Sequence, residues 1–451
     1  MTDELPHPLI PDGASVRDAL ESLRRSGLGL VCIVAEDRRV VGVASDGDLR
    51  SAMLGGASLN DPISAAMNRE FVWVRENAPR EHVLKLLDTR IRVAPILDRE
   101  GRFISMATRD YAGSNGALYA RAKAPVRLSL AGGGTDITHH FIKKNGVCLS
   151  ATMARYSHVI LKRRPDRVVK FISRDLDQVV EAASLDAITY DGNLDLLKAG
   201  ARLMRPDYGF ELLAACDFPP ASGLGGSATL LAAVIACFNE FRIEKLGPYE
   251  IAEHAFEAER IELGVAGGWQ DQYATVFGGI NFMEFTFDRN LVVPLRASRA
   301  TLCELEERLL ICHTGQEHLG SAVHERLRAR STEDDYQDFS AALSDIAQRM
   351  RDDLLRGHLA DFGRLLHETW MLKRRFSPNA SSEGLDSVYD VAIEAGAQGG
   401  RLLGTGGGGF FLFSCDPFRW HDVAGALRQM GLQVDSVVLD TEGLRSWTYA
   451  A

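Results

Sequence analysis

A glycine-rich segment that runs straight into an apolar stretch has the composition of a phosphate-binding loop. Residues 219–227 read Pro-Pro-Ala-Ser-Gly-Leu-Gly-Gly-Ser, and residues 228–239 are almost all apolar. Glycines allow backbone conformations in which several N–H groups converge on one anion, and the following helix adds its positive dipole end. A hydroxyl at Ser227 would reach a metal ion on that anion. The loop residues expected to contact phosphate are Pro220, Ser222, Gly223, Leu224, Gly225, Gly226 and Ser227.

This loop matches neither of two common nucleotide-binding signatures. It lacks the Gly-Lys-Ser/Thr ending of a Walker A loop, and it lacks the GxGxxG spacing. An ordinary glycine-rich turn between a strand and a helix is therefore the alternative for this segment.

Two carboxylates further along supply chemistry that phosphoryl transfer needs. Glu259 is expected near the end of a helix that begins after residue 248, and Asp271 follows a turn at residues 267–268. One carboxylate would hold magnesium, and the other would lie near an acceptor hydroxyl. Solvated surface carboxylates are the alternative for both.

Two more glycine-rich loops lie next to strand-like segments. Residues 131–136 read Ala-Gly-Gly-Gly-Thr-Asp and follow an alternating strand, so that Arg127 and Asp136, nine residues apart, are expected to face one pocket. Residues 404–409 precede an apolar strand. Each turn alone can be structural, but together they indicate several places where the backbone closes on a ligand.

Composition limits the class of protein. The chain has 451 residues with 46% apolar and 25% charged side chains, which predicts a globular protein of two to four domains. The net charge of −10 argues against a broad nucleic-acid surface. The longest apolar run, 228–238, is about half of the ~20 residues that a membrane span requires. Seven scattered cysteines without a CxxC pair, and an N-terminus without a signal-peptide pattern, predict free thiols and a cytoplasmic location.

The first part of the chain contains an internal repeat. Residues 14–23 and 78–87 have the apolar spacing of short helices, and each is followed by two β-type stretches joined by a turn. This pattern resembles a CBS domain pair over residues 8–111. The resemblance implies adenine-nucleotide binding (AMP, ADP or ATP) by Ser45 and Asp48. The second repeat departs from the motif at Asp110, and a Ser-x-x-Asp pattern can equally cap a helix. A purely structural or dimerising module is the alternative, so a homodimer is possible.

The linker is expected where turn formers replace apolar periodicity, around residues 112–121. We therefore expect a regulatory domain over 1–115, a linker over 116–121, and a catalytic part from 122 to the end.

The motifs of the catalytic part resemble the GHMP kinase superfamily. The resemblance rests on Ala124-Pro-Val-Arg127, Thr135-Asp136, the 219–227 loop with Gly226 in place of a serine, and the glycines of 404–409. It implies an α+β fold of two subdomains, 122–295 (like domain 2 of ribosomal protein S5) and 296–451 (ferredoxin-like). It also implies ATP and Mg²⁺, with the metal on Ser227 and Glu259. Asp271 would orient or deprotonate the acceptor hydroxyl, and Arg127 would fix Asp271.

Within that superfamily the chain is similar to the D-glycero-D-manno-heptose 7-phosphate kinases. The shared motifs include residues 131–136, residues 267–273 (Gly-Gly-Trp-Gln-Asp-Gln-Tyr) and residues 370–374 (Trp-Met-Leu-Lys-Arg). Trp269 stands where that branch usually has lysine, and His139-His140 stand where prolines are common. The resemblance implies transfer to an anomeric hydroxyl, with Lys373, Arg374 or Arg401 near a substrate phosphate. The expected substrate-binding residues are Gly133, Gly134, Thr135, Asp136, Trp269, Gln270, Lys373, Arg374, Gly404, Thr405, Gly406 and Gly407.

Three alternatives stay open at this point. The substrate could be a fucose- or galactose-like sugar, because the departures at Trp269 and His139-His140 remove a pocket cation and add aromatic surface. The fold could serve a non-catalytic sugar or nucleotide sensor, although Ser227, Glu259, Asp271 and Arg127 together argue against it. The N-terminal repeat could also be the main functional part.

Overall fold

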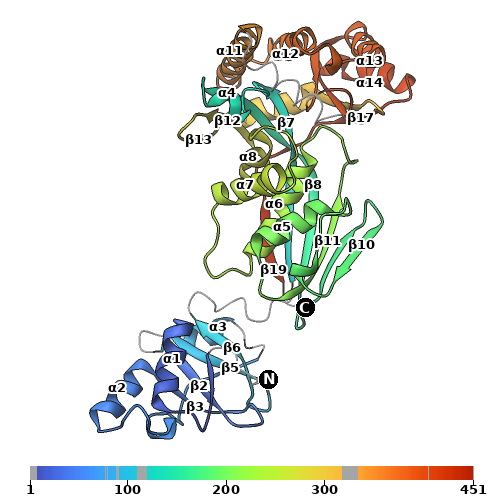
Figure 1. Cartoon of the computed structure of the whole chain (residues 1–451). Coiled ribbons are helices and arrows are strands. Elements are labelled where there is room, and N and C mark those ends of the chain that lie inside the picture. Colours follow the sequence, from blue (N-terminus) through green and yellow to red (C-terminus); the bar gives the residue numbers. More distant parts are fainter. Residues whose placement is uncertain are drawn as a thin grey trace. The chain divides into compact units, whose positions relative to one another are not determined.

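The computed structural model describes residues 8–76, 78, 80–87, 91–108, 119–316, 334–404 and 406–449. They divide into two compact units, one within residues 8–108 and the other over residues 119–449 (Figure 1). Thr405 and Asp110 lie outside the described residues, as does most of the predicted linker. Residues 119–121 of that linker differ from the prediction, because they form the start of a long paired strand.

The first unit consists of two similar halves, as the internal repeat predicts. Each half has a three-stranded sheet in which a short first strand pairs in parallel with the second, and the second pairs antiparallel with the third. Each half buries its own apolar cluster. The elements are β1 (Leu9–Pro11), α1 (Val16–Ser26), β2 (Leu30–Val34), β3 (Val40–Ser45), α2 (Asp46–Leu54), β4 (Val74–Arg75), α3 (Arg80–Leu86), β5 (Val93–Leu97) and β6 (Phe103–Thr108).

The second unit is built around a nine-stranded sheet whose central strand, β8, runs from Gly146 to Arg164. Helices α5 to α8 pack together beside this sheet, and α6 lies directly against β7 and β8 (Figure 1). α6 is apolar all round and almost wholly buried, as expected for a helix at the centre of a core. The other strands are β7 (Tyr119–Ala131), β9 (Val169–Ser173), β10 (Gln178–Ala182), β11 (Gly209–Cys216), β12 (Ile280–Phe285), β13 (Asn290–Pro294), β18 (Leu439–Asp440) and β19 (Arg445–Tyr449). The helices up to α8 are α4 (Thr138–Phe141), α5 (Asp195–Met204), α6 (Gly226–Asn239), α7 (Pro248–Phe256) and α8 (Gln270–Phe277).

A smaller four-stranded sheet, in the order β15-β16-β14-β17, forms the rest of this unit. Helix α12 packs on β15, and α13 and α14 pack on each other beside the sheet. The elements are α9 (Arg299–Arg308), β14 (Leu309–His313), α11 (Asp334–Arg356), α12 (Phe362–Phe376), α13 (Glu383–Glu394), β15 (Ala397–Leu402), β16 (Phe410–Cys415), α14 (Trp420–Gln429) and β17 (Gln433–Ser436). The α+β class with a preceding two-repeat unit is therefore confirmed.

The end of the chain returns to the large sheet. β18 pairs with β8, and β19 pairs with β7 over five residues, with Tyr449 opposite Tyr119. The predicted division of the catalytic part at residues 295/296 assigns β18 and β19 to the second half, although both strands pair within the large sheet. That division stays a prediction.

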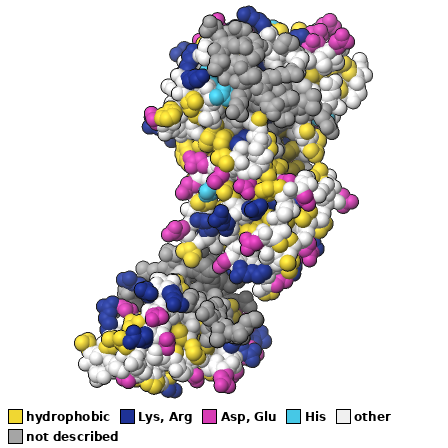
Figure 2. Space-filling view, in the orientation of Figure 1, with side chains coloured by type: hydrophobic (Ala, Val, Ile, Leu, Met, Phe, Trp, Pro, Cys, Tyr) yellow, Lys and Arg dark blue, Asp and Glu magenta, His cyan; other side chains and the backbone are white. Residues whose placement is uncertain are grey.

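Surface charge and membrane propensity agree with the composition. Basic and acidic side chains are interspersed on the face shown in Figure 2, without one continuous basic area among the described residues. Across the described part of the chain, no helix has both the length and the apolarity to cross a membrane. All seven cysteines are free thiols.

Candidate active site

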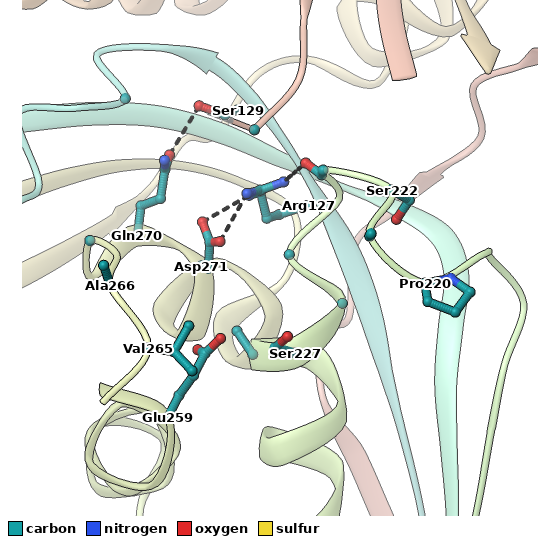
Figure 3. Close-up of a pocket in the computed structure, with 18 of the residues that line it drawn as sticks. Arg127, Ser129, Pro220, Ser222, Ser227, Glu259, Val265, Ala266, Gln270 and Asp271 are labelled. Carbon is teal, nitrogen blue, oxygen red and sulfur yellow. Dashed lines mark hydrogen bonds and ion pairs between the residues drawn. The ribbon is translucent and has the colours of Figure 1, made fainter. Parts of the chain in front are cut away.

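One cavity of about 360 Å³ brings together segments that are far apart in the sequence. Its wall includes β7, the 131–136 loop, the 219–228 segment, residues 259–271 and parts of α12 and β15. Figure 3 shows Asp271, Arg127, Ser227 and Glu259 around this space. The motifs selected from the sequence therefore meet at one place.

The 219–227 loop has the backbone geometry that its glycines permit. Gly223 and Gly225 have φ values of +74° and +76°, a region that other residues rarely adopt. Gly225 is the N-cap of α6, so the first N–H groups of a 14-residue helix open toward the pocket, with Ser227 in its first turn. Among the loop residues expected to contact phosphate, Leu224 does not line the cavity, because its side chain is fully buried in the core.

Close packing against the 404–409 loop fixes this conformation. A Cβ on Gly223 would lie 2.9 Å from the Leu403 carbonyl oxygen, and a Cβ on Gly409 would lie 2.3 Å from the Ser222 carbonyl oxygen. At these two positions glycine is needed for the approach of one backbone to another. The 404–409 loop and the residue before it therefore hold the 219–227 loop in place through these two backbone contacts.

Arg127 and Asp271 form a bidentate ion pair deep in the pocket. Arg127 Nε and Nη2 each donate to one Asp271 oxygen at 2.8 Å, and Arg127 Nη1 donates to the carbonyl of Gly223. Arg127 is only 4% exposed, whereas the Asp271 side chain keeps 17% of its surface accessible. The pair thus links β7, the start of α8 and the glycine loop, as Figure 3 shows. The two parallel hydrogen bonds fix the carboxylate in one orientation.

Glu259 is a buried carboxylate on a π-helical turn, residues 257–262, that continues α7. Gln272 Nε2 donates to Glu259 Oε2 at 2.8 Å, and Arg260 Nη2 lies 3.4 Å from the same oxygen. Burial raises the pKa of Glu259, and the negative charge of Asp271 adds to that rise while Arg260 opposes it. A bound cation would remove both unfavourable effects, so the donor set fits a hard divalent metal ion.

The other wall of the pocket is formed by the 131–136 loop and the segment before α8. Asp136 is 3% exposed and accepts hydrogen bonds from the Gly134 and Gln270 N–H groups at 2.9 and 3.1 Å. Burial raises the pKa of Asp136. A Cβ on Gly268 would lie 1.9 Å from Asp136 Oδ2, which explains the glycine there. Gly133, Gly134, Asp136 and Gln270 all line the cavity.

Several residues expected at the substrate lie elsewhere. Thr135 is fully buried, where its hydroxyl accepts from the Val147 N–H. The Trp269 ring stacks on Phe256 at 3.6 Å, and its Nε1 donates to Thr138. Neither residue lines the cavity, and the geometry gives both a packing role.

The C-terminal candidates separate in the same way. Arg374 points to Asp386, 2.8 Å away, and lines a different surface depression. Lys373 and Gly404 line the main cavity, whereas Gly406 and Gly407 do not. A Cβ on Gly406 would meet the Ala380 backbone at 2.8 Å, so this glycine serves packing.

The structure adds two polar residues that the sequence analysis omitted. Ser129 Oγ donates to Gln270 Oε1 at 3.1 Å, and the Arg260 guanidinium donates to the Ala266 carbonyl beside Glu259. Both line the cavity. Ser129 is two residues after Arg127 on the same strand, so the alternation of side chains would have placed it on the same face. No spacing rule identifies Arg260, because it depends on the π-helical turn.

Apolar side chains also line the cavity. They include Leu176, Leu196, Phe218 and Pro219. Such a surface suits a flat aromatic group next to the phosphate loop.

In the N-terminal unit, Ser45 and Asp48 form the cap of α2. Ser45 Oγ lies 2.6 Å from Asp48 Oδ2 and accepts from the Asp48 N–H, and the Ser45 N–H donates to Asp48 Oδ2. Both residues are thus fixed by this capping box, which leaves nucleotide binding at this place as a prediction.

Comparisons with known proteins agree with this architecture. Residues 195–279 match the GHMP kinases N terminal domain, and residues 350–431 match the GHMP kinases C terminal model. Residues 1–55 and 63–111 match the CBS domain. The N-terminal part is also 37% identical over 101 residues to the arabinose 5-phosphate isomerase of Salmonella typhi, which covers 22% of this chain and 31% of that protein.

Two relatives align with nearly three quarters of the chain. The chain is 36% identical over 333 residues to the D-glycero-alpha-D-manno-heptose 7-phosphate kinase of Campylobacter jejuni, which is 72% of this chain and 98% of that protein. A crystal structure of a D-glycero-D-manno-heptose 1-phosphate kinase from Bacteroides thetaiotaomicron superposes with a TM-score of 0.63 at 29% identity, covering 74% of this chain and all of the other. The chain belongs to the GHMP kinase family. It is a sugar kinase, a phosphotransferase that acts on a sugar hydroxyl, with a CBS domain pair at its N-terminus.

Proposed function

We propose that the protein transfers the γ-phosphoryl group of ATP to the anomeric hydroxyl of a heptose 7-phosphate. The observation that carries this proposal is the Arg127–Asp271 pair, which faces the pocket beside the N-terminus of α6. A positioned carboxylate next to an anion-binding helix end is the arrangement that phosphoryl transfer to a hydroxyl requires.

The loop and helix bind the donor. The N–H groups of the 219–227 loop and of the first turn of α6 donate hydrogen bonds to the phosphates, and the apolar lining at Leu176, Leu196 and Phe218 contacts the base. In this arrangement the terminal phosphate points toward Asp271. Phosphate binding requires only the backbone of the loop, so the buried Leu224 side chain is compatible with it.

Asp271 acts on the acceptor. In this proposal its carboxylate accepts a hydrogen bond from the sugar hydroxyl and takes the proton as the oxygen attacks phosphorus. Arg127 keeps the carboxylate oriented, and its charge offsets the negative charge that develops on the transferred group. Most of the rate enhancement would come from this positioning, as in other phosphoryl transfers.

Mg²⁺ would be held by Ser227 and Glu259. Glu259 fits this role, because burial and the charge of Asp271 destabilise its ionised carboxylate and a neighbouring cation would stabilise it. When bound, the ion would neutralise negative charge on the donor phosphates. Gln272 and Arg260 orient the carboxylate from behind.

The sugar would bind between Asp136, Gln270, Ser129 and the glycines of the 131–136 loop. The names of the two relatives differ in the position of the phosphate, 7-phosphate in one and 1-phosphate in the other. Both are consistent with a heptose, and the first also with transfer to the anomeric position of a sugar that already carries a phosphate.

The test is product identification. The full-length protein, ATP and Mg²⁺ are incubated with D-glycero-D-manno-heptose 7-phosphate, the unphosphorylated heptose, fucose and galactose, and ³¹P and ¹H NMR identify the product. We expect a heptose 1,7-bisphosphate. Phosphorylation of fucose or galactose alone would assign a different sugar. If none of the four sugars supports ATP consumption, the proposal is contradicted.

We also propose that the CBS pair binds an adenine nucleotide through Ser45 and Asp48 and adjusts the kinase rate. CBS domains commonly bind adenosine nucleotides, and the Asp48 carboxylate is partly accessible at the start of α2. Isothermal titration of the full chain with AMP, ADP and ATP tests this proposal. An absence of binding other than at the kinase site would leave the pair with a structural or dimerising role.

A further inference from the structure

Helix α11 contributes part of the wall of the active-site cavity. Tyr336, Phe339 and Leu343 follow one another at three- and four-residue spacing, so they lie on one face of the helix, and all three are buried. Phe339 and Leu343 line the cavity. The same three side chains belong to an apolar cluster that includes Ile137, which directly follows the 131–136 loop. This face of α11 therefore packs beside the loop that is proposed to bind the sugar.

The Tyr336 hydroxyl reaches the backbone of that loop. It donates to the carbonyl oxygen of Gly134 at 3.1 Å, and the Gly134 N–H donates to Asp136 Oδ1 at 2.9 Å. Gly134 has a φ of +109°, and a Cβ there would meet nothing within 4 Å, so glycine is required for the backbone conformation and not for space. Hydrogen bonds thus hold both polar backbone groups of Gly134, and one of them comes from a helix 202 residues further along the chain.

Neighbouring rings fix the position of Tyr336. It is 1% exposed, and the rings of His140 and Phe376 lie edge-on to it, with centroids at 5.4 and 5.7 Å. Burial raises the pKa of Tyr336, and the charge of Asp136 adds to the rise, so the hydroxyl keeps its proton and remains a donor. Burial lowers the pKa of His140 to about 4, so this ring packs as a neutral group near neutral pH. One of the two histidines that depart from the heptose kinase pattern therefore supports Tyr336.

We propose that Tyr336 is a positioning residue for the acceptor sugar: its hydroxyl holds the Gly134 carbonyl and thereby keeps Asp136 in the conformation that binds the sugar. This inference rests on the proposed function, in which the 131–136 loop binds the acceptor. Tyr336 does not itself line the cavity, so its effect must pass through the loop. Without the hydroxyl, the loop would have to be ordered when the sugar binds, and this ordering would reduce the affinity for the sugar.

The effect should be confined to the acceptor. The 219–227 loop is held by its own contacts with Leu403 and Gly409, and the Arg127–Asp271 pair is bonded directly. These contacts do not involve Tyr336. Loss of the hydroxyl should therefore weaken sugar binding and leave ATP binding and the reacting carboxylate unchanged.

The experiment removes the hydroxyl alone. Tyr336→Phe keeps the ring and its packing, and initial rates of the full-length wild type and variant are measured against D-glycero-D-manno-heptose 7-phosphate and ATP. We expect KM for the sugar to rise about 3- to 10-fold, the usual effect of losing one neutral hydrogen bond. KM for ATP and kcat should change less than about twofold, because the loss acts on acceptor binding.

Tyr389→Phe is the matched control. Tyr389, on α13, is 2% exposed, its hydroxyl lies 2.7 Å from His367 Nδ1, and it does not line the cavity. Both variants lose one buried hydrogen bond, so their melting temperatures should fall by similar amounts. Only Tyr336→Phe should raise KM for the sugar. An equal rise in both variants, a rise in KM for ATP, or an unchanged KM for the sugar would overturn the inference.

Hydrogen–deuterium exchange separates this inference from the proposed function. The peptide that covers residues 131–141 should exchange faster in ligand-free Tyr336→Phe than in the wild type, and at the wild-type rate in Tyr389→Phe. Equal exchange in all three proteins would show that Tyr336 does not hold the loop, whatever the substrate. If the wild type does not phosphorylate the heptose 7-phosphate, the proposed function fails, and the exchange comparison still decides whether Tyr336 positions the loop.

Discussion

At the scale of single residues, the pocket contains some charged side chains that have a full counterion within the protein and others that do not. Arg127 and Asp271 satisfy each other through two hydrogen bonds of 2.8 Å. Glu259 has only the partial compensation of Arg260 and Gln272, and Lys373 and Arg401 repel each other. The balanced pair orients the reacting group, and the unbalanced groups mark where a metal ion and a substrate anion would bind.

The first prediction concerns the balanced pair. Asp271→Asn keeps the size of the side chain but removes the charge and the proton acceptor, so kcat should fall by about 10²- to 10⁴-fold. ATP affinity, measured by isothermal titration, should change little because the loop and α6 are intact. Asp422→Asn, an exposed carboxylate on α14, is the control and should retain full activity. Near-normal turnover of the Asp271 variant would show that another group serves the acceptor.

The second prediction concerns Glu259 and pH. Because its pKa is raised, Glu259 becomes protonated at a higher pH than an ordinary glutamate, and the protonated form cannot bind a metal ion. The Mg²⁺ concentration for half-maximal rate should therefore increase as pH falls. Glu259→Gln should raise that concentration at every pH and make it depend less on pH. Titrations of rate against Mg²⁺ at several pH values check this, and an unchanged dependence in the variant would move the metal site elsewhere.

At the scale of elements, backbone contacts between two glycine-rich loops hold the phosphate-binding geometry. Gly223 approaches the carbonyl of Leu403, and Gly409 approaches that of Ser222. The two loops are about 180 residues apart in sequence, so the donor site exists only when both subdomains are folded.

The third prediction tests this contact. Gly223→Ala puts a Cβ at a φ of +74° and 2.9 Å from a backbone oxygen, so it should displace the loop, weaken ATP binding and lower stability by about 1–3 kcal/mol. Gly425→Ala, within α14 where a Cβ would meet nothing within 4 Å, is the matched control and should be neutral or stabilising by up to ~1 kcal/mol. Thermal unfolding measures the stability of both variants, and nucleotide titration measures their affinity for ATP. Equal behaviour of the two variants would mean that the loop adapts.

Much of this architecture can be predicted from the sequence because it depends on local patterns. The repeated helices, the strand that contains Arg127 and the glycine loop before α6 each have a periodicity or composition of their own. Strands β1 and β4 could not be predicted, because their three and two residues are too short for an alternating pattern. They exist through pairing with β2 and β5.

The choice between neighbouring residues was also beyond the sequence. Lys373 and Arg374 are adjacent on a helix, so they point about 100° apart, and only the position of β15 and α13 decides which enters the pocket. Lys373 does, while Arg374 pairs with Asp386. The position of Trp269 could not be predicted for the same reason, because its stacking partner Phe256 belongs to the preceding helix.

At the scale of the whole molecule, the CBS pair and the kinase are successive units of one chain. Any influence of a nucleotide on the kinase must be reciprocal, because an effector that favours one state of the kinase is itself bound more tightly in that state. A typical coupling of about 1–3 kcal/mol would change substrate affinity roughly 5- to 150-fold.

The fourth prediction tests that coupling without disturbing the fold. In Asp48→Asn the new side chain can still accept the hydrogen bond from the Ser45 N–H in the capping box of α2, but it loses the charge proposed to hold the ribose hydroxyls. The variant should keep the basal kinase rate and lose any response to millimolar AMP or ADP. Rates with and without AMP, at fixed ATP, measure this. Asp18→Asn, at the corresponding position in the capping box of α1, is the control. An identical AMP response in both variants would place the regulatory nucleotide at another site.

The pairing of β19 with β7 has a consequence for protein engineering. Tyr119 and Tyr449 are cross-strand partners, so the two ends of the kinase unit meet at one edge of its large sheet. A short hairpin could join them, and new termini could be opened in an exposed loop without extending any connection across the fold. Such a circular permutant would retain the catalytic sheet, and the regulatory unit could then be re-attached at a chosen loop. The loop chosen for insertion of the regulatory unit would then determine how that unit controls the kinase.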